Sequence, residues 1–274
     1  MHKYACLNEN SVTTLKWRPM VNSTFKTLVT ADSEGALEYW HIPSMKKLFM
    51  MREHDNTINT IDFNRTGTLF ATAGKDCNIR VYDEETKSLT QTLKKADWNH
   101  TGHDNRIFAV KFIEDKLLIS GGWDSVIHIW DVRTGKSVRH MYGSNISGES
   151  LDFQDGRVLA GCYSVKDQIQ VWDFNKGTRI ETIDWTHNPD IAAYVYAASY
   201  SKHDIGMIGA GSTGAESSVK IFKDIKKNGK HELLNEVKRV NEGCFSLDFH
   251  HNKSEFAFTT AHHGMYVYEI RKKK

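Results

Sequence analysis

One short pattern returns along the whole chain: a strand-like run that ends in an aromatic residue followed by a polar one. The closing aromatic residues, at intervals of 42, 48, 42, 50 and 46 residues, are Trp40, Tyr82, Trp130, Trp172, Phe222 and Tyr268. A period in the forties, with several strand-forming runs in each unit, is typical of a β-propeller. Because a repeat buries its faces only against its neighbours, we expect residues 1–274 to form a single all-β, ring-like domain.

Four short runs of β-forming residues are expected in each unit, separated by Gly, Asn and Asp turns. In the second repeat they fall at 58–63, 69–73, 78–82 and 88–93. The last unit has only three runs, and we expect residues 3–7 to supply its fourth strand and close the ring. The length fits six blades of about 45 residues each. Seven blades, or an open ring completed by a partner's strand, are the alternatives.

The units resemble WD40 repeats, most completely in the third. Gly102-His103 opens this unit, Gly121-Gly122-Trp123-Asp124 forms its central turn, and Trp130-Asp131 closes it. The resemblance implies a WD40-type propeller in which a His, a Ser or Thr, an Asp and an aromatic residue of one blade form a buried hydrogen-bonded tetrad. On this sequence the tetrads are His103, Ser120, Asp124 and Trp130 in the third blade, and His54, Thr72, Asp76 and Tyr82 in the second.

Composition excludes several classes of protein. A formal net charge of +2 provides no bulk attraction to nucleic acid or to an anionic membrane. We find no apolar run long enough to span a bilayer and no secretory signal near Met1, so membrane insertion is not expected. Cys6, Cys77, Cys162 and Cys244 lie in separate units, as expected for reduced thiols inside the cell. The predicted location is the cytoplasm, with the nucleus and the cytoskeleton as alternatives.

Motifs of catalysis are absent from the sequence. It contains neither a Gly-rich phosphate loop nor a nucleophile elbow. The adjacent pairs His250-His251 and His262-His263 would point to opposite faces of a strand, which is poor geometry for one metal ion. We therefore predict no enzyme activity, cofactor, metal or small-molecule substrate. The basic segments 226–230 and 271–274 are interpreted as solvated charge rather than as a nucleic-acid site.

The resemblance also implies where partners bind. In WD40 propellers, contacts often come from the top face, at the start of each innermost strand and just before the tetrad acid. The corresponding residues here are Asn59, Lys75, Arg106, Phe108, Trp123, Tyr194, Tyr196 and Phe245. Trp98 joins this set because it lies in an insertion, as does Trp185, and an indole on a loop exposes a large apolar area.

These features predict a non-catalytic scaffold that binds protein or peptide partners through its top face, as a subunit of a complex. Arginine and aromatic residues beside one another are typical of the few anchors that dominate protein interfaces. The alternative is an architectural subunit of a larger fixed assembly, such as a coat, pore or cytoskeletal complex, engaged through edge strands or the bottom face. The fold alone does not name the partner.

Overall fold

The computed structural model describes residues 10–19, 26–95, 101–186, 192–224, 230–238, 240, 243–261 and 264–270. They belong to two compact units, Met1–His140 and Met141–Lys274. The predicted closing strand at 3–7, the insertion residue Trp98, the pair His262-His263 and residues 226–227 lie outside the described residues. None of the helices among the described residues has the length and apolar character needed to cross a membrane.

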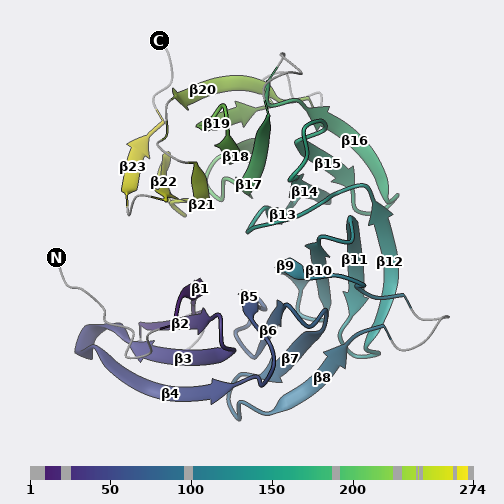
Figure 1. Ribbon diagram of the computed structural model, residues 1–274, viewed down its shortest axis with the longest axis vertical. Coiled ribbons are helices and arrows are strands. Elements are labelled where there is room, and N and C mark those ends of the chain that lie inside the picture. Colours follow the sequence, from purple (N-terminus) through teal and green to yellow (C-terminus); the bar gives the residue numbers. More distant parts are fainter. Residues whose placement is uncertain are drawn as a thin grey trace. The chain divides into compact units, whose positions relative to one another are not determined.

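The first unit contains three four-stranded antiparallel sheets whose strands follow one another in chain order (Figure 1). The first sheet consists of β1 (Val12–Trp17), β2 (Thr27–Asp32), β3 (Ala36–His41) and β4 (Lys46–Arg52), with a 3-10 turn at Ile42–Ser44. The second consists of β5 (Ile58–Phe63), β6 (Leu69–Gly74), β7 (Ile79–Asp83) and β8 (Leu89–Leu93). The third consists of β9 (Ile107–Glu114), β10 (Leu117–Gly122), β11 (Val126–Asp131) and β12 (Lys136–Tyr142), and β12 runs across the unit boundary.

The second unit repeats this plan in three further sheets. The fourth sheet consists of β13 (Leu151–Gln154), β14 (Arg157–Gly161), β15 (Ile169–Asp173) and β16 (Thr178–Ile183). The fifth consists of β17 (Ala193–Tyr200), β18 (Met207–Gly214), β19 (Ser218–Lys223) and β20 (Glu232–Lys238). The sixth has three strands, β21 (Cys244–Phe249), β22 (Glu255–Thr260) and β23 (Met265–Glu269).

The hydrophobic core lies between neighbouring sheets of each unit. In the first unit, Leu37 of the first sheet belongs to one cluster with Phe70 of the second. Another cluster joins Ile79 of the second sheet to Trp130 of the third. The second unit has equivalent clusters between its fourth and fifth and its fifth and sixth sheets. Within each unit, each sheet therefore acts as one blade that buries a face against its neighbour, as expected of a repeat fold.

Five of the six blades share an irregularity near the start of the innermost strand. The register between the first and second strands slips there, which leaves one inner-strand residue without an opposite partner. A β-bulge of this kind re-aims the side chain of the extra residue. The five bulge residues are Thr13, Asn59, Phe108, Tyr196 and Phe245. Four of these five are among the residues that the sequence predicts for partner binding.

The sixth blade ends on an exposed strand. All five side chains of β23 are exposed, with Met265 at 70% and Val267 at 63%. The third strands of complete blades, such as β7 and β15, bury most of their side chains. Since residues 3–7 lie outside the described residues, the fourth strand of this blade remains a prediction.

Candidate protein-interaction surfaces

A second recurring feature stands beside the bulges, in the turn that follows the second strand of a blade. There, a backbone N–H donates to a backbone carbonyl that precedes the inner strand, by one residue in four blades and by six residues in the fourth blade. The donors and acceptors are Ser33 and Ser11 (3.1 Å), Lys75 and Thr57 (3.0 Å), Trp123 and Arg106 (3.0 Å), Tyr163 and Asn145 (2.7 Å), and Ala215 and Ala192 (3.0 Å). Gly122 permits this approach, because a Cβ there would lie 2.1 Å from the Arg106 oxygen. Bulge and turn thus place two side chains at the same end of a blade.

In the third blade these two positions carry aromatic rings. Phe108, at the bulge, packs against Trp123, at the turn, with ring centres 5.0 Å apart. The Arg106 guanidinium lies 5.6 Å from the centre of the Trp123 ring, within the range of a cation–π contact. Trp123 is 43% exposed although it makes both contacts. We call Arg106, Phe108 and Trp123 the tryptophan surface.

In the first and second blades the bulge side chains instead donate hydrogen bonds to backbone carbonyls. Asn59 Nδ2 donates to the Ile107 carbonyl oxygen of the third blade at 2.9 Å. Thr13 Oγ1 donates in the same way to the Ile58 carbonyl oxygen of the second blade. Asn59 therefore ties two blades together, which gives it a structural role that the sequence did not indicate. Lys75 occupies the turn position of its blade and is exposed.

In the second unit the same positions form a larger aromatic cluster. Tyr163 stacks on Tyr194 with ring centres 4.4 Å apart and meets Tyr196 edge-on at 5.6 Å. Tyr196 in turn contacts Phe245 of the next blade at 5.3 Å. Tyr163 and Phe245 are 41% and 42% exposed. We call Tyr163, Tyr194, Tyr196 and Phe245 the tyrosine surface.

Tyr163 was not predicted from the sequence. Its blade has no tetrad acid next to it, so the rule that selects Lys75 and Trp123 does not find it. The signal was nevertheless present, since Gly161-Cys162-Tyr163 aligns with Gly121-Gly122-Trp123. The Tyr163 N–H also donates to a carbonyl that precedes the inner strand of its blade, that of Asn145, six residues before β13.

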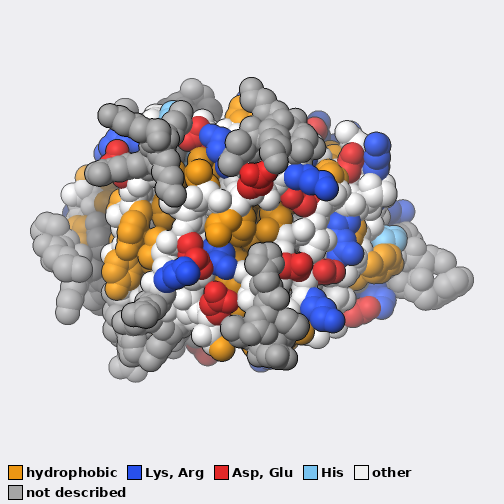
Figure 2. Space-filling model, turned by 90° about the horizontal axis from the view of Figure 1, so that it is seen from above, with side chains coloured by type: hydrophobic (Ala, Val, Ile, Leu, Met, Phe, Trp, Pro, Cys, Tyr) orange, Lys and Arg blue, Asp and Glu red, His pale blue; other side chains and the backbone are white. Residues whose placement is uncertain are grey.

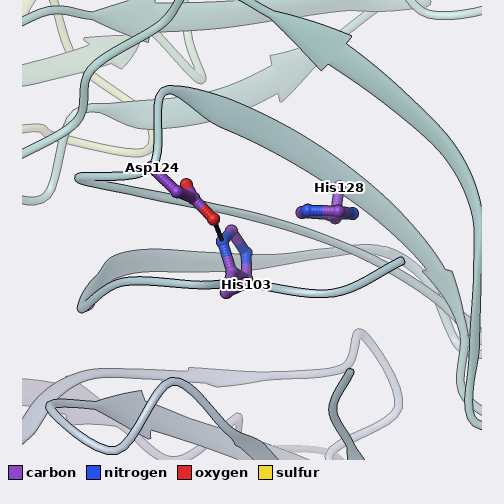
Figure 3. Close-up of side chains that lie close together, drawn as sticks. All are labelled: His103, Asp124 and His128. Atoms are coloured by element: carbon purple, nitrogen blue, oxygen red, sulfur yellow. Dashed lines mark hydrogen bonds and ion pairs between the residues drawn. The ribbon is translucent and has the colours of Figure 1, made fainter. Parts of the chain in front are cut away.

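The tetrad of the third blade adjoins the tryptophan surface, because its Asp124 follows Trp123 in the chain. His103 Nδ1 lies 2.6 Å from Asp124 Oδ2 (Figure 3), and its Nε2 lies 2.6 Å from Ser120 Oγ. Trp130 Nε1 donates to the same Ser120 oxygen at 2.8 Å. Burial would raise the pKa of Asp124, but the hydrogen bond and charge of His103, with two backbone N–H groups, hold it below its ordinary value. Since Asp124 follows Trp123 directly, this network fixes the turn that presents the indole.

A second histidine lies against this tetrad. The His128 ring centre is 4.5 Å from that of His103, and Figure 3 shows His128 beside the His103–Asp124 pair. Burial first, and then the neighbouring His103, lowers the pKa of His128 to about 3. The ligand atoms of His103, Asp124 and His128 lie within 4.8 Å of one another. Both nitrogens of His103 are already hydrogen-bonded, so a metal ion would have to break the tetrad.

The second blade differs from the predicted tetrad. Glu53, not His54, occupies the centre: its Oε1 accepts from Thr72 Oγ1 and, at 2.9 Å, from the Tyr82 hydroxyl. His54 is exposed. Asp76 pairs with Arg80 at 2.5 Å, and Arg80 also reaches Glu53 at 3.1 Å.

The physical reason lies in the donors around this centre. A carboxylate can accept hydrogen bonds from both hydroxyl groups and form an ion pair with an arginine at the same time, whereas an imidazole cannot. Burial and the nearby Glu53 carboxylate raise the pKa of Tyr82, which keeps its hydroxyl protonated as a donor. The assignment of His54 is therefore wrong, and Asp76 belongs to an ion pair rather than to a His–Asp bond.

The other predicted insertion residue is part of the core. Trp185 is 2% exposed and belongs to the cluster between the fourth and fifth blades. Lys220 Nζ donates to its carbonyl oxygen at 2.5 Å and lies 4.8 Å from its ring centre. Trp185 is thus a packing residue rather than an exposed contact.

Other apolar side chains are also exposed in the described parts. Figure 2 shows separate groups of hydrophobic side chains between charged ones on one face of the molecule. Among the exposed residues outside the two aromatic surfaces are Trp17, Leu48 and Val138. Exposure of single apolar residues is normal, so it is the contacts among neighbouring rings that distinguish the two surfaces.

Comparison with known proteins identifies the class. Residues 27–151 match the family model of the DDB1- and CUL4-associated factor 12 beta propeller. A chain in the crystal structure of a mitotic checkpoint complex superposes with a TM-score of 0.81, with 17% identity, over 98% of this chain and 78% of that one. With the six sheets described above, this shows an all-β, six-bladed propeller, and the chain is similar to proteins of the WD40-type β-propeller family.

Curated relatives carry WD repeats in longer proteins. WD repeat-containing protein 1 of Xenopus tropicalis is 26% identical over 191 residues, which cover 64% of this chain and 30% of that protein. Nuclear distribution protein nudF 1 of Talaromyces marneffei is 28% identical over 52% of this chain and 30% of its own length. Human WD and tetratricopeptide repeats protein 1 is 33% identical over 40% of this chain and 17% of its own. The chain thus spans less than a third of these relatives.

Proposed function

We propose that the chain is a non-catalytic scaffold that docks a protein partner on the top face over the second and third blades. Arg106, Phe108 and Trp123 anchor the partner, and Lys75 lies at the rim. The observation that carries this proposal is the contact of Phe108 and the Arg106 guanidinium with an indole that is still 43% exposed. Proteins of this class generally serve as interaction scaffolds, and we place this one in a cytoplasmic complex, with the nucleus and cytoskeleton as alternatives.

The arrangement of the tryptophan surface suits a binding hot spot. Trp123 and Arg106 are the residue types that most often dominate interfaces, and both are held in place before a partner arrives. The indole is fixed by Phe108 and by the tetrad acid next to it in the chain. Preorganisation of this kind reduces the conformational entropy that binding costs. A guanidinium carries five N–H donors, with which Arg106 can donate to a partner's oxygen atoms while it lies over the indole.

Capture of partners from cells by single variants tests the proposal. Trp123→Ala and Arg106→Ala should each weaken capture of the main partner by at least about thirtyfold, the loss typical of a hot spot worth 2 kcal/mol. The matched control is Trp17→Ala, which removes a tryptophan that is 55% exposed outside the surface. Charge reversal at Lys226, Lys227 and Lys230 is the second control. Loss of capture in either control, with capture retained in Trp123→Ala, would contradict the proposal.

A second candidate function rests on the exposed edge of the sixth blade. An edge strand with exposed apolar side chains is a template for pairing with another strand. This favours the alternative of an architectural subunit whose β23 edge is engaged, either by residues 3–7 or by a partner. If residues 3–7 occupy the edge, deletion of residues 1–9 should cause aggregation and lower the melting temperature. If a partner occupies it, the deletion should leave the isolated protein monodisperse with an unchanged melting temperature.

A further inference from the structure

The tyrosine surface is the larger of the two aromatic surfaces, and it joins three consecutive blades. Tyr163 comes from the turn after β14, Tyr194 and Tyr196 from β17, and Phe245 from β21. The ring centre of Tyr163 lies 4.4 Å from that of Tyr194 and 5.6 Å from that of Tyr196, and the ring centre of Tyr196 lies 5.3 Å from that of Phe245. Tyr163 and Tyr194 are nearly parallel (19°), whereas Tyr196 lies at 87° to Tyr163 and at 62° to Phe245, so the touching rings form an angled platform rather than the walls of an empty cage.

Other aromatic rings of the protein carry a cation of their own. The cation–π pairs, with the distance from the cation to the ring centre, are Lys47 on Trp40 (5.8 Å), Lys87 on Tyr39 (4.4 Å), Arg106 on Trp123 (5.6 Å), Arg179 on Trp172 (6.0 Å) and Lys220 on Trp185 (4.8 Å). Within the described ranges, no Lys or Arg lies over a ring of the tyrosine surface. Its four electron-rich faces are therefore left without the positive charge that aromatic faces attract.

We infer that the tyrosine surface binds an arginine side chain on an extended segment of a partner protein. A guanidinium is flat and weakly hydrated, so it can stack on a platform of touching rings, whereas a compact ammonium ion is better held inside a cage. Its edge N–H groups can donate to the tyrosine hydroxyl oxygens, which accept hydrogen bonds. This site is independent of the tryptophan surface, where Arg106 already supplies the cation and an arginine from a partner would be repelled.

The surroundings of Tyr196 agree with this chemistry. Burial first, and then the neighbouring Tyr163, raises the pKa of Tyr196, so its hydroxyl stays neutral at physiological pH. No charged side chain contributes to that shift. The attraction for a cation therefore comes from the rings rather than from a carboxylate, and a salt bridge is not required.

The test measures the fluorescence anisotropy of a labelled six-arginine peptide mixed with the full chain at physiological salt. The comparison peptide contains six citrullines, which keep the shape of arginine without its charge. The wild-type chain should bind the arginine peptide at least about fivefold more tightly than the citrulline peptide, the ratio expected from one cation–π contact. Tyr163→Ser and Phe245→Ser should each weaken binding of the arginine peptide about threefold or more.

Trp123→Ala is the matched control, because Trp123 is exposed to the same degree as Tyr163 and Phe245. It should leave binding of the arginine peptide unchanged or slightly tighter. Equal binding of the two peptides, an equal loss in Trp123→Ala, or no binding of the arginine peptide to the wild-type chain would overturn the inference. Circular dichroism of each variant identifies misfolding, and Tyr163 and Phe245 are on different blades, so one of the two variants suffices if the other fails to fold. These outcomes leave the proposal for the tryptophan surface unaffected.

Discussion

The tryptophan surface and the tyrosine surface occupy equivalent positions in the two units. They differ in the groups that contact and hold their exposed aromatic rings. Trp123 is covered in part by its own arginine and is fixed by the tetrad through Asp124. Tyr163 has neither, and is held by ring stacking and one backbone bond. The same two backbone positions, bulge and turn, thus produce one surface that already contains a cation and one that lacks it. The two proposed sites therefore differ in the group that each would recognise.

The largest expected difference between the two regions is in the dependence of the free energy of unfolding on acid pH. His128 packs against His103 of the tetrad next to the tryptophan surface and has a folded pKa of about 3, facing His103, Asp124, His140 and Asp104. An unfolded histidine binds its proton near pH 6.5, so the stability tied to neutral His128 is complete above that pH and is lost as the pH falls towards 3. The loss is at most about 1.4 kcal/mol per pH unit.

Urea unfolding between pH 7.5 and pH 4 measures this dependence. The variant His128→Asn should flatten the acid limb, and the control His54→Asn, at an exposed position, should not. An acid limb that is identical in His128→Asn and the wild-type chain would show that His128 does not carry the effect.

The next largest expected effect is the difference in stability lost when the side chain that holds each turn is removed. Asp124→Ala leaves the buried His103 without its partner and should lower the free energy of unfolding by about 1–3 kcal/mol. Asp167→Ala, in the corresponding loop of the fourth blade, removes an exposed pair with Arg179 and should cost less than about 1 kcal/mol. Thermal unfolding of both variants measures the difference, and equal melting temperatures would show that the tetrad does not support its turn.

Asn59 distinguishes a bulge residue that ties blades from one that meets partners. Asn59→Ala removes the bond to the Ile107 carbonyl and should cost about 1 kcal/mol of stability. Partner capture per folded molecule should stay unchanged, because the side chain is already engaged. A variant of wild-type stability that no longer captures the partner would reverse this assignment.

The smallest expected effect is at the rim. Lys75→Ala, at an exposed turn, should change the free energy of unfolding by less than about 0.5 kcal/mol. Its effect on capture should be smaller than that of Arg106→Ala, since rim residues are solvated. Equilibrium unfolding and partner capture are measured for this variant and for Arg106→Ala. A loss of capture in Lys75→Ala as large as that in Arg106→Ala would contradict the assignment of Lys75 to the rim.

The sequence was sufficient to predict the blades because each repeat carries its own strand pattern and closing aromatic residue. The predicted strand at 58–63 is β5, and the run at 78–82 differs from β7 by one residue at each end. The contacts among Arg106, Phe108 and Trp123 could be predicted because the third blade keeps the complete repeat.

What could not be predicted depends on blades that have drifted from the repeat. Glu53 replaces His54 because a half-buried Arg80 is available to neutralise a carboxylate, and this contact is visible only in three dimensions. Tyr163 was missed because its turn lacks the acid used as a landmark. The burial of Trp185 depends on Lys220, which is 35 residues away in the chain.

Hydroxyl-radical footprinting of the chain, free and in complex with its captured partner, tests the central claim most directly. The method reports the solvent exposure of single aromatic side chains. The account predicts that Trp123 and Phe108 are protected in the complex while Trp17 and Tyr266 keep the reactivity of the free chain. Unchanged reactivity of Trp123, with new protection of Tyr266 and Tyr268 on β23, would contradict it and would favour engagement through the edge strand.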